Sequence, residues 1–126
     1  MKTVINTPQA PAPIGPYNQA IQAGNHLYVS GQIPLSPATG ELVQGSVGDE
    51  ARQVLENLQA VLAAAGYSFS DVVKTTIFLR SMDDFAAVNT VYGEYFTENA
   101  PARETVAVAG LPKNVRVEIS LIAWKA

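Results

Sequence analysis

Two charged residues stand out in the last thirty positions of this 126-residue chain. Arg103 lies in the run Arg103–Val108 and Glu118 in the run Val115–Trp124, and both runs are otherwise rich in β-branched and apolar residues. Charged side chains are rarely buried without a partner, so each must reach water, a counter-ion or a ligand. The two could form a structural ion pair, lie on a wet sheet face, or belong to a binding site.

Strand alternation sorts the neighbours of these charges, because successive side chains of a strand point to opposite faces. Thr105 shares the face of Arg103. Glu104 points the other way and should not neutralise Arg103 within one chain. Glu118 points to the face opposite that of Val117 and the other apolar side chains of its run.

Other positions could contribute to a site, each with a structural alternative. Gly15-Pro16 directly before Tyr17 suits a positioned phenol, but it also suits any anchored turn. Gly31 after Ser30 permits close backbone approach by a ligand, or only a β-bulge. Asn89 lies beside an apolar helical stripe and is either a structural hydrogen bonder or a substrate contact.

The composition indicates one globular domain, residues 1–126, without several kinds of chemistry. Charged residues make up only 15% of the chain, which is poor for a monomer's surface and suggests self-association. The lack of cysteine excludes disulfides and thiolate sites, and any His-based site would depend on His26 alone. A net charge of −3 with scattered basic residues predicts no nucleic-acid surface. No signal peptide or membrane span is recognisable, which predicts a cytoplasmic protein.

Strands are predicted where apolar and β-branched runs are bounded by turn residues. Gly24-Asn25 predicts a tight hairpin, and the prolines of residues 6–16 predict a loop. Gly110–Asn114 predicts a turn between the two C-terminal runs. The predicted strands are 2–5, 19–23, 26–30, 71–79 and the runs that end at Val108 and Trp124.

Two helices are predicted from apolar residues at helical spacing. Asp49 and Glu50 suit the positive end of the first, whose opposite face, including Asn57, should be polar. Asp83 or Asp84 should cap the second. The apolar stripes are Ala51, Val54, Leu55, Leu58, Val61, Leu62 and Ala65 in the first helix, and Phe85, Val88, Tyr92 and Phe96 in the second.

This order of elements predicts an α+β domain in which one mixed six-stranded sheet carries two helices on one face. Val117 and Leu121 can then pack beneath the helices. The other face would expose Tyr28, Ala107 and Trp124, an apolar patch that a monomer rarely shows. We therefore expect that face to be buried against other subunits.

Four motifs of the chain resemble those of the Rid family of reactive intermediate deaminases, also called YjgF. The resemblance covers nearly the whole chain. It implies a chorismate-mutase-like fold and a homotrimer whose sheets form a central barrel, with three ligand clefts between subunits. The motifs are Ile14–Ala20, Ser30–Pro34, Pro101–Arg103, and Leu111–Lys113 followed by Val117–Ile119.

The resemblance also implies an activity. Deaminases of this family hydrolyse 2-enamine and 2-imino acids, among them 2-aminoacrylate, 2-iminopropanoate and 2-iminobutanoate, to 2-keto acids and ammonia. Pyridoxal-phosphate-dependent Ser/Thr dehydratases release such substrates, so a functional link to those enzymes is expected. Neither a metal nor an organic cofactor is implied, because the imine carbon is already electrophilic.

By matching positions, the resemblance assigns roles to the candidates. Arg103 would hold the substrate carboxylate with two parallel hydrogen bonds. Glu118 would orient or deprotonate the attacking water. Tyr17 and Ser30 would line the cleft, and the Gly31 backbone would let the ligand approach closely.

The chain departs from many relatives directly after the motif arginine. Those relatives carry Ser-Cys where this chain has Glu104-Thr105. Thr105 would then form a polar wall of the cleft, without thiol chemistry.

Two other functions stay open. One is an RNA-directed translation inhibitor or endoribonuclease, for which an acidic chain is a poor electrostatic match. The other is a non-catalytic small-anion-binding or chaperone-like trimer, which would keep Arg103 but would not need Glu118.

Overall fold

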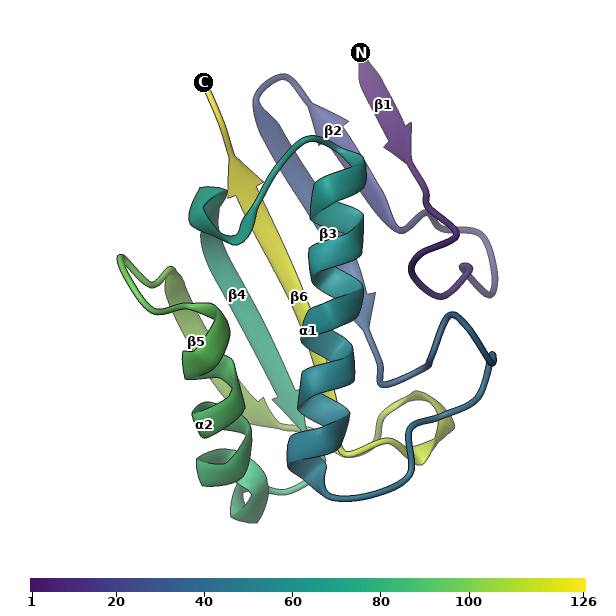
Figure 1. Ribbon diagram of the computed structural model, residues 1–126, viewed down its shortest axis with the longest axis vertical. Coiled ribbons are helices and arrows are strands. Elements are labelled where there is room, and N and C mark those ends of the chain that lie inside the picture. Colours follow the sequence, from purple (N-terminus) through teal and green to yellow (C-terminus); the bar gives the residue numbers. More distant parts are fainter.

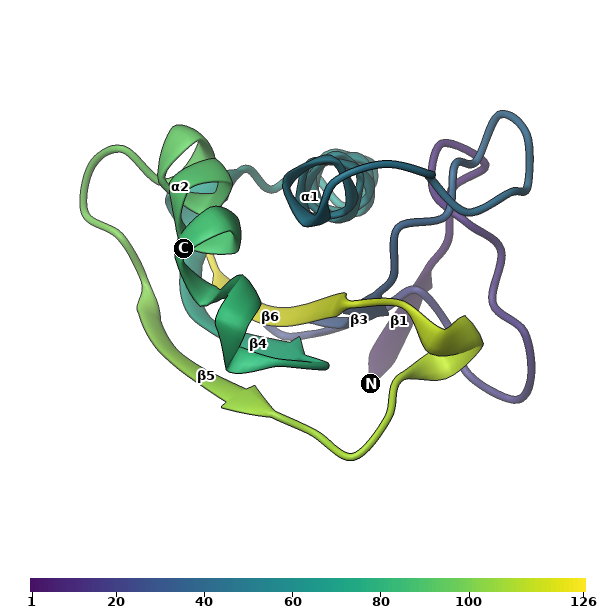
Figure 2. The same ribbon diagram turned by 90° about the horizontal axis from the view of Figure 1, so that it is seen from below.

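The structure, a computed structural model, describes all residues 1–126 and has two layers (Figure 1). Figure 2 shows both helices on the same face of one six-stranded sheet, so the predicted α+β architecture is confirmed. The trimeric barrel stays a prediction. The elements are β1 (Lys2–Ile5), β2 (Ala20–Ala23), β3 (His26–Gln32), α1 (Val47–Ala64), β4 (Val72–Leu79), α2 (Phe85–Tyr95), β5 (Ala102–Ala107) and β6 (Val117–Trp124).

The sheet order is β1-β2-β3-β6-β4-β5, and only β4 and β5 run parallel. The last two strands therefore do not form a hairpin, because β4 lies between them. Both ends of their connection bind the end of β4: Val108 N donates to Leu79 O, and Arg80 N donates to Arg116 O. This topology puts the two charged candidates on strands that flank β4.

Alternation along the central strands produces one buried and one uncovered face. In β6, Val117, Ile119, Leu121 and Ala123 are buried beneath the helices, whereas Glu118 and Ile122 lie on the other face. Tyr28 and Trp124 are exposed there, as predicted. Ala107 was predicted to lie on the same uncovered face, and this is wrong. It pairs in parallel register with Leu79, which is buried beneath the helices, so Ala107 faces the helix side.

Helix α1 begins at Val47, and Asp49 and Glu50 lie in its first turn, as predicted. Ser46 caps it in a reciprocal box, in which its hydroxyl accepts from Asp49 N and Asp49 Oδ2 accepts from Ser46 N, both at 3.1 Å. Asn57 does not lie on a polar face but is buried, since its amide donates to Ile33 O and Leu35 O of the segment after β3. The packing of that segment onto α1 overrides the helical pattern.

The predicted cap of the second helix is confirmed in position, since Asp84 is the N-cap residue of α2. A 3₁₀ turn, Met82–Asp84, leads into α2, and the hydroxyl of Ser81 accepts from Asp83 N at 3.1 Å. Neither Asp83 nor Asp84 caps α2 with its side chain. Neither helix has the length and apolar character that crossing a membrane requires.

Candidate active site

A cavity of about 580 Å³ opens where β3, β6 and the proline-rich loop meet. We call it the Glu118 cavity. The apolar part of its wall consists of Pro11, Ile14, Ile33, Leu35 and Pro112. Four of the predicted site residues line it together: Tyr17, Ser30, Gly31 and Glu118.

A β-bulge at Ser30-Gly31 makes room for the Glu118 carboxylate. The register of β3 against β6 shifts between Val29 and Gln32, which leaves one extra residue on β3. A Cβ added at Gly31 would lie only 2.2 Å from Oε2 of Glu118. Gly31 is therefore both a bulge and a point of close approach, and the group that approaches it is a carboxylate of the same chain.

Glu118 is a half-buried carboxylate without a partner. No ion pair reaches it, although Lys113 lines the same cavity. Burial raises the pKa of Glu118, and no hydrogen bond opposes that shift. A carboxylate with a raised pKa is a stronger base than an exposed one, which suits it to accept a proton from water.

Two hydroxyl groups complete the polar wall of the Glu118 cavity. Ser30 Oγ donates to Asn18 O at 2.7 Å, so its lone pairs remain available to accept. Tyr17 Oη accepts from Ile14 N at 3.4 Å, so its proton remains available to donate. The cavity thus offers an acceptor, a donor and a base to a small molecule with both N–H and C=O groups.

Gln19 holds the loop that forms one side of this cavity, a role the sequence did not reveal. Its buried amide nitrogen donates to the carbonyl oxygens of Thr7, Ala10 and Pro11 at 2.8–3.2 Å. Its Oε1 accepts from Thr7 N at 2.6 Å. These bonds satisfy backbone groups that the prolines leave outside any sheet. Gln19 lies within the Ile14–Ala20 motif, directly before β2, but a single Gln carries no signal of its own.

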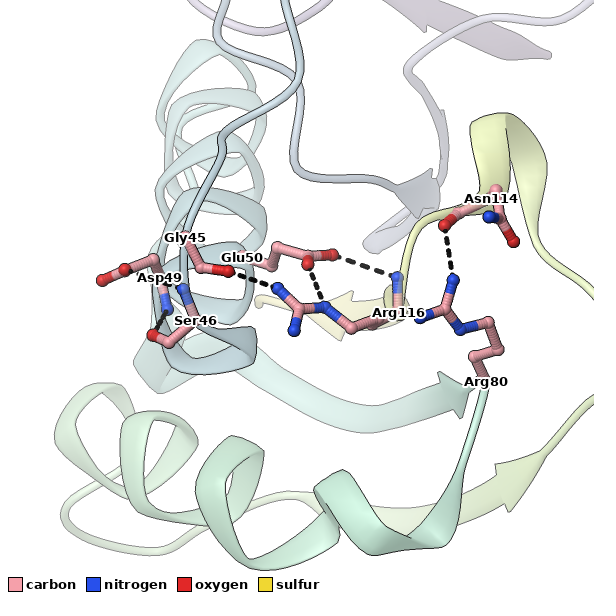
Figure 3. A network of polar contacts seen from close by, with 7 residues as sticks. All are labelled: Gly45, Ser46, Asp49, Glu50, Arg80, Asn114 and Arg116. Atoms are coloured by element: carbon pink, nitrogen blue, oxygen red, sulfur yellow. Dashed lines mark hydrogen bonds and ion pairs between the residues drawn. The ribbon is translucent and has the colours of Figure 1, made fainter.

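A polar network surrounds Arg116, which lies in the segment between the cavity-lining residues Lys113 and Glu118 (Figure 3). Buried Glu50 of α1 accepts from both the backbone N and Nε of Arg116, and Arg116 Nη2 donates to Gly45 O. Arg80 Nη1 donates to Asn114 O at 3.0 Å. The network fixes the segment between Lys113 and Glu118. Glu50 was predicted only to favour the positive end of a helix, so this ion pair was missed.

The remaining candidates, Arg103, Asn89 and Thr105, gather elsewhere. Arg103 Nη1 donates to Asn89 Oδ1 at 2.8 Å, and the Arg103 guanidinium carbon lies 4.9 Å from the centre of the Tyr92 ring. No carboxylate pairs with Arg103. Thr105 lines the same small cavity as Arg103, and its buried hydroxyl has no hydrogen-bond partner. Asn89 thus contacts the arginine.

Glu104 lies on the other face, as predicted. Its carboxylate accepts from the hydroxyl of Thr76 and pairs with Lys74 at 3.0 Å, and both contacts lower the pKa of Glu104. The register of β5 is continuous over Ala102–Ala107, so no bulge turns this carboxylate toward Arg103. The positive charge of Arg103 is not neutralised.

The two charged candidates lie on opposite faces of the sheet. Arg103 pairs in register with Thr75, which faces the helices, whereas Glu118 faces the uncovered side. They form no ion pair, so that structural explanation does not hold within the chain. No group of three or more His, Asp or Glu side chains could hold a metal ion.

Comparison with known proteins identifies the family. The profile of the family described as endoribonuclease L-PSP matches residues 7–125. A RutC family protein of Pyrococcus horikoshii is 58% identical over 125 residues, which cover 99% of each chain.

The chain belongs to the endoribonuclease L-PSP family.

Its relatives carry different functional names. A protein of Dermatophagoides farinae called 2-iminobutanoate/2-iminopropanoate deaminase is 54% identical, with 96% of this chain and 94% of the relative covered. A crystal structure of a Thermotoga maritima protein superposes with a TM-score of 0.98 at 55% identity, covering 100% of this chain and 99% of that one. The resemblance to the Rid family is confirmed over the full fold.

Proposed function

We propose that this family member hydrolyses 2-imino acids and their 2-enamine tautomers to 2-keto acids and ammonia. The observation that carries the proposal is the unpaired, half-buried Glu118 carboxylate in a cavity that also offers hydroxyl groups. The relative from Dermatophagoides farinae is called 2-iminobutanoate/2-iminopropanoate deaminase, and that name supports the same substrate class.

In this proposal Glu118 acts as the base. The imine is protonated on nitrogen, and Glu118 takes a proton from water as the water oxygen bonds to C2, which gives a neutral tetrahedral aminoalcohol. Glu118 returns that proton to the nitrogen and takes the hydroxyl proton as the C–N bond breaks. Ammonia then leaves with a 2-keto acid, and Glu118 releases its proton to water. Ser30 can accept from the substrate N–H, and Tyr17 can donate to a substrate oxygen.

Arg103 binds the substrate carboxylate with its free N–H groups. Since Arg103 and Glu118 lie on opposite faces of one sheet, we propose that each cleft takes them from two neighbouring subunits of a homotrimer. The exposed apolar side chains Tyr28, Val106 and Trp124 support self-association through the uncovered face. The cytoplasmic location and the link to pyridoxal-phosphate-dependent dehydratases stay predictions.

RNA cleavage, which the family description suggests, fits the site less well. The Glu118 cavity contains one cation, Lys113, and the only histidine is not among its lining residues. A phosphate backbone is normally met by several basic side chains.

The test is a coupled assay in which a Ser/Thr dehydratase generates 2-aminoacrylate from serine. We expect this protein to speed the loss of the imine above its spontaneous rate in water and to release equal amounts of pyruvate and ammonia. A rate equal to that of water alone would reject the proposed activity and leave a non-catalytic anion-binding protein.

A further inference from the structure

The Arg103 guanidinium lies against one face of α2. Phe85, Asn89 and Tyr92 follow one another at spacings of four and three residues, so they lie on the same side of the helix. The guanidinium carbon is 4.9 Å from the Tyr92 ring centre and 5.7 Å from that of Phe85. Asn89 accepts one N–H at 2.8 Å. We call these three residues the Arg103 cradle.

Tyr92 is itself fixed by the strand next to Arg103. Its hydroxyl shares a 2.7 Å hydrogen bond with Thr75 Oγ1, and both groups are buried. Thr75 on β4 is the residue that pairs in register with Arg103 on β5. The Tyr92 ring therefore joins adjacent positions of two parallel strands to the helix above them. Its other neighbour is Phe96, with ring centres 4.5 Å apart.

We propose that Tyr92 is a positioning residue for carboxylate recognition, because its ring, held by Thr75, fixes the plane in which Arg103 presents its N–H groups. The ligand class is the planar carboxylate of a small 2-keto or 2-imino acid. This inference rests on the proposed function only for the identity of the ligand.

The cradle leaves N–H donors of Arg103 free to bind a carboxylate. A guanidinium has five N–H donors along its edges, of which Asn89 uses one. An aromatic ring beside the cation accepts no hydrogen bond in place of the ligand when the two stack, so the N–H donors stay free. A two-point grip on a carboxylate needs two donors on one edge in a fixed plane. Holding that plane before binding reduces the freedom lost when the ligand arrives.

The experiment measures pyruvate affinity by calorimetry for the intact oligomer and three variants. Tyr92→Leu removes the ring and should weaken pyruvate binding about tenfold, with a matching rise in KM and a smaller change in kcat. Tyr92→Phe keeps the ring but loses its hydrogen bond to Thr75, so pyruvate binding should weaken less than in Tyr92→Leu and stay within about threefold of the unmodified protein. The matched control is Tyr95→Leu, since Tyr95 lies on α2 but its hydroxyl contacts Glu56 rather than the cradle.

A second measurement keeps the inference testable where Tyr92→Leu fails to fold. In the unmodified protein, the side-chain NMR signals of Arg103 should be shifted upfield by the Tyr92 ring relative to those of Arg80, which has no such ring. Unshifted Arg103 signals would overturn the inference.

The outcomes separate this inference from the proposed function. Equal pyruvate affinity in Tyr92→Leu and the unmodified protein would reject the role of Tyr92 and leave imine hydrolysis standing. Pyruvate binding that depends on Tyr92, without any imine hydrolysis, would reject the proposed function alone. No pyruvate binding by the unmodified protein would overturn both.

Discussion

The Arg103 cradle and the Glu118 cavity differ in how they surround a charge: the Arg103 cation has partners, whereas the Glu118 carboxylate has none. The Arg103 guanidinium has an amide acceptor and two aromatic neighbours. The Glu118 carboxylate has no hydrogen-bond donor or counter-ion, and burial raises its pKa. In the proposed function, the Arg103 charge is held in a fixed orientation for binding, whereas the Glu118 charge is kept reactive at a cost in stability.

The largest expected effect is on turnover when the reactive charge is removed. Glu118→Gln keeps the size of the side chain but removes the base, so imine hydrolysis should fall about 10²- to 10⁴-fold while pyruvate binding survives. The control is Glu98→Gln at an exposed position. Loss of binding and turnover together would show that Glu118 binds the ligand rather than acting as a base.

On the binding side, Arg103→Lys keeps the charge and loses the planar two-point grip. Turnover should fall by about two to three orders of magnitude, because a lysine ammonium is a point charge. Steady-state kinetics with Arg52→Lys, at an exposed pair with Glu94, provide the control. Near-normal kinetics in Arg103→Lys would mean that another group holds the carboxylate.

Gly31→Ala tests the Glu118 cavity without touching its charge. The new methyl group would meet Glu118 Oε2 at 2.2 Å and Cδ at 2.8 Å, so the carboxylate must move. A displacement on this scale should lower turnover about 10²-fold. Gly93→Ala, whose methyl would meet nothing within 4 Å, should leave turnover unchanged. Normal turnover in Gly31→Ala would show that the carboxylate position is not critical.

The smallest effect concerns stability and its pH dependence. Because the folded state raises the pKa of Glu118, ionised Glu118 destabilises the fold above that pKa. Glu118→Gln should therefore unfold at a higher temperature than the unmodified protein at pH 7. The difference should shrink as pH falls through the raised pKa. Equal melting temperatures at pH 7 would show that the carboxylate is not strained by its burial.

Much of this comparison was accessible from the sequence. Alternation within β5 placed Thr105 with Arg103 and Glu104 on the other face, because a strand of regular register leaves no other choice. The hairpin at Gly24-Asn25 and both helical stripes followed from local periodicity as well. Local pattern is sufficient where neighbouring residues determine the outcome.

Long-range partners could not be predicted in this way. Nothing near Glu50 in sequence indicates Arg116, and the Arg103 cradle depends on α2 packing over β5. The sequence also did not show that β4 lies between β5 and β6. A turn-like linker is compatible both with two strands that pair as a hairpin and with two strands that do not pair. The separation of Arg103 from Glu118 follows from the position of β4 and from alternation together.

We propose that Arg103 and Glu118 act on one ligand from different subunits, and a mixture of two inactive variants can test this arrangement. Arg103→Ala and Glu118→Gln are refolded together in equal amounts, and each alone serves as the control. If the two residues come from neighbouring subunits of a ring, about a quarter of the clefts in random mixed oligomers contain both intact residues. We predict recovery of imine hydrolysis to about that fraction of the unmodified rate. Mixed oligomers with no more activity than the separate variants would show that Arg103 and Glu118 do not share a cleft between subunits.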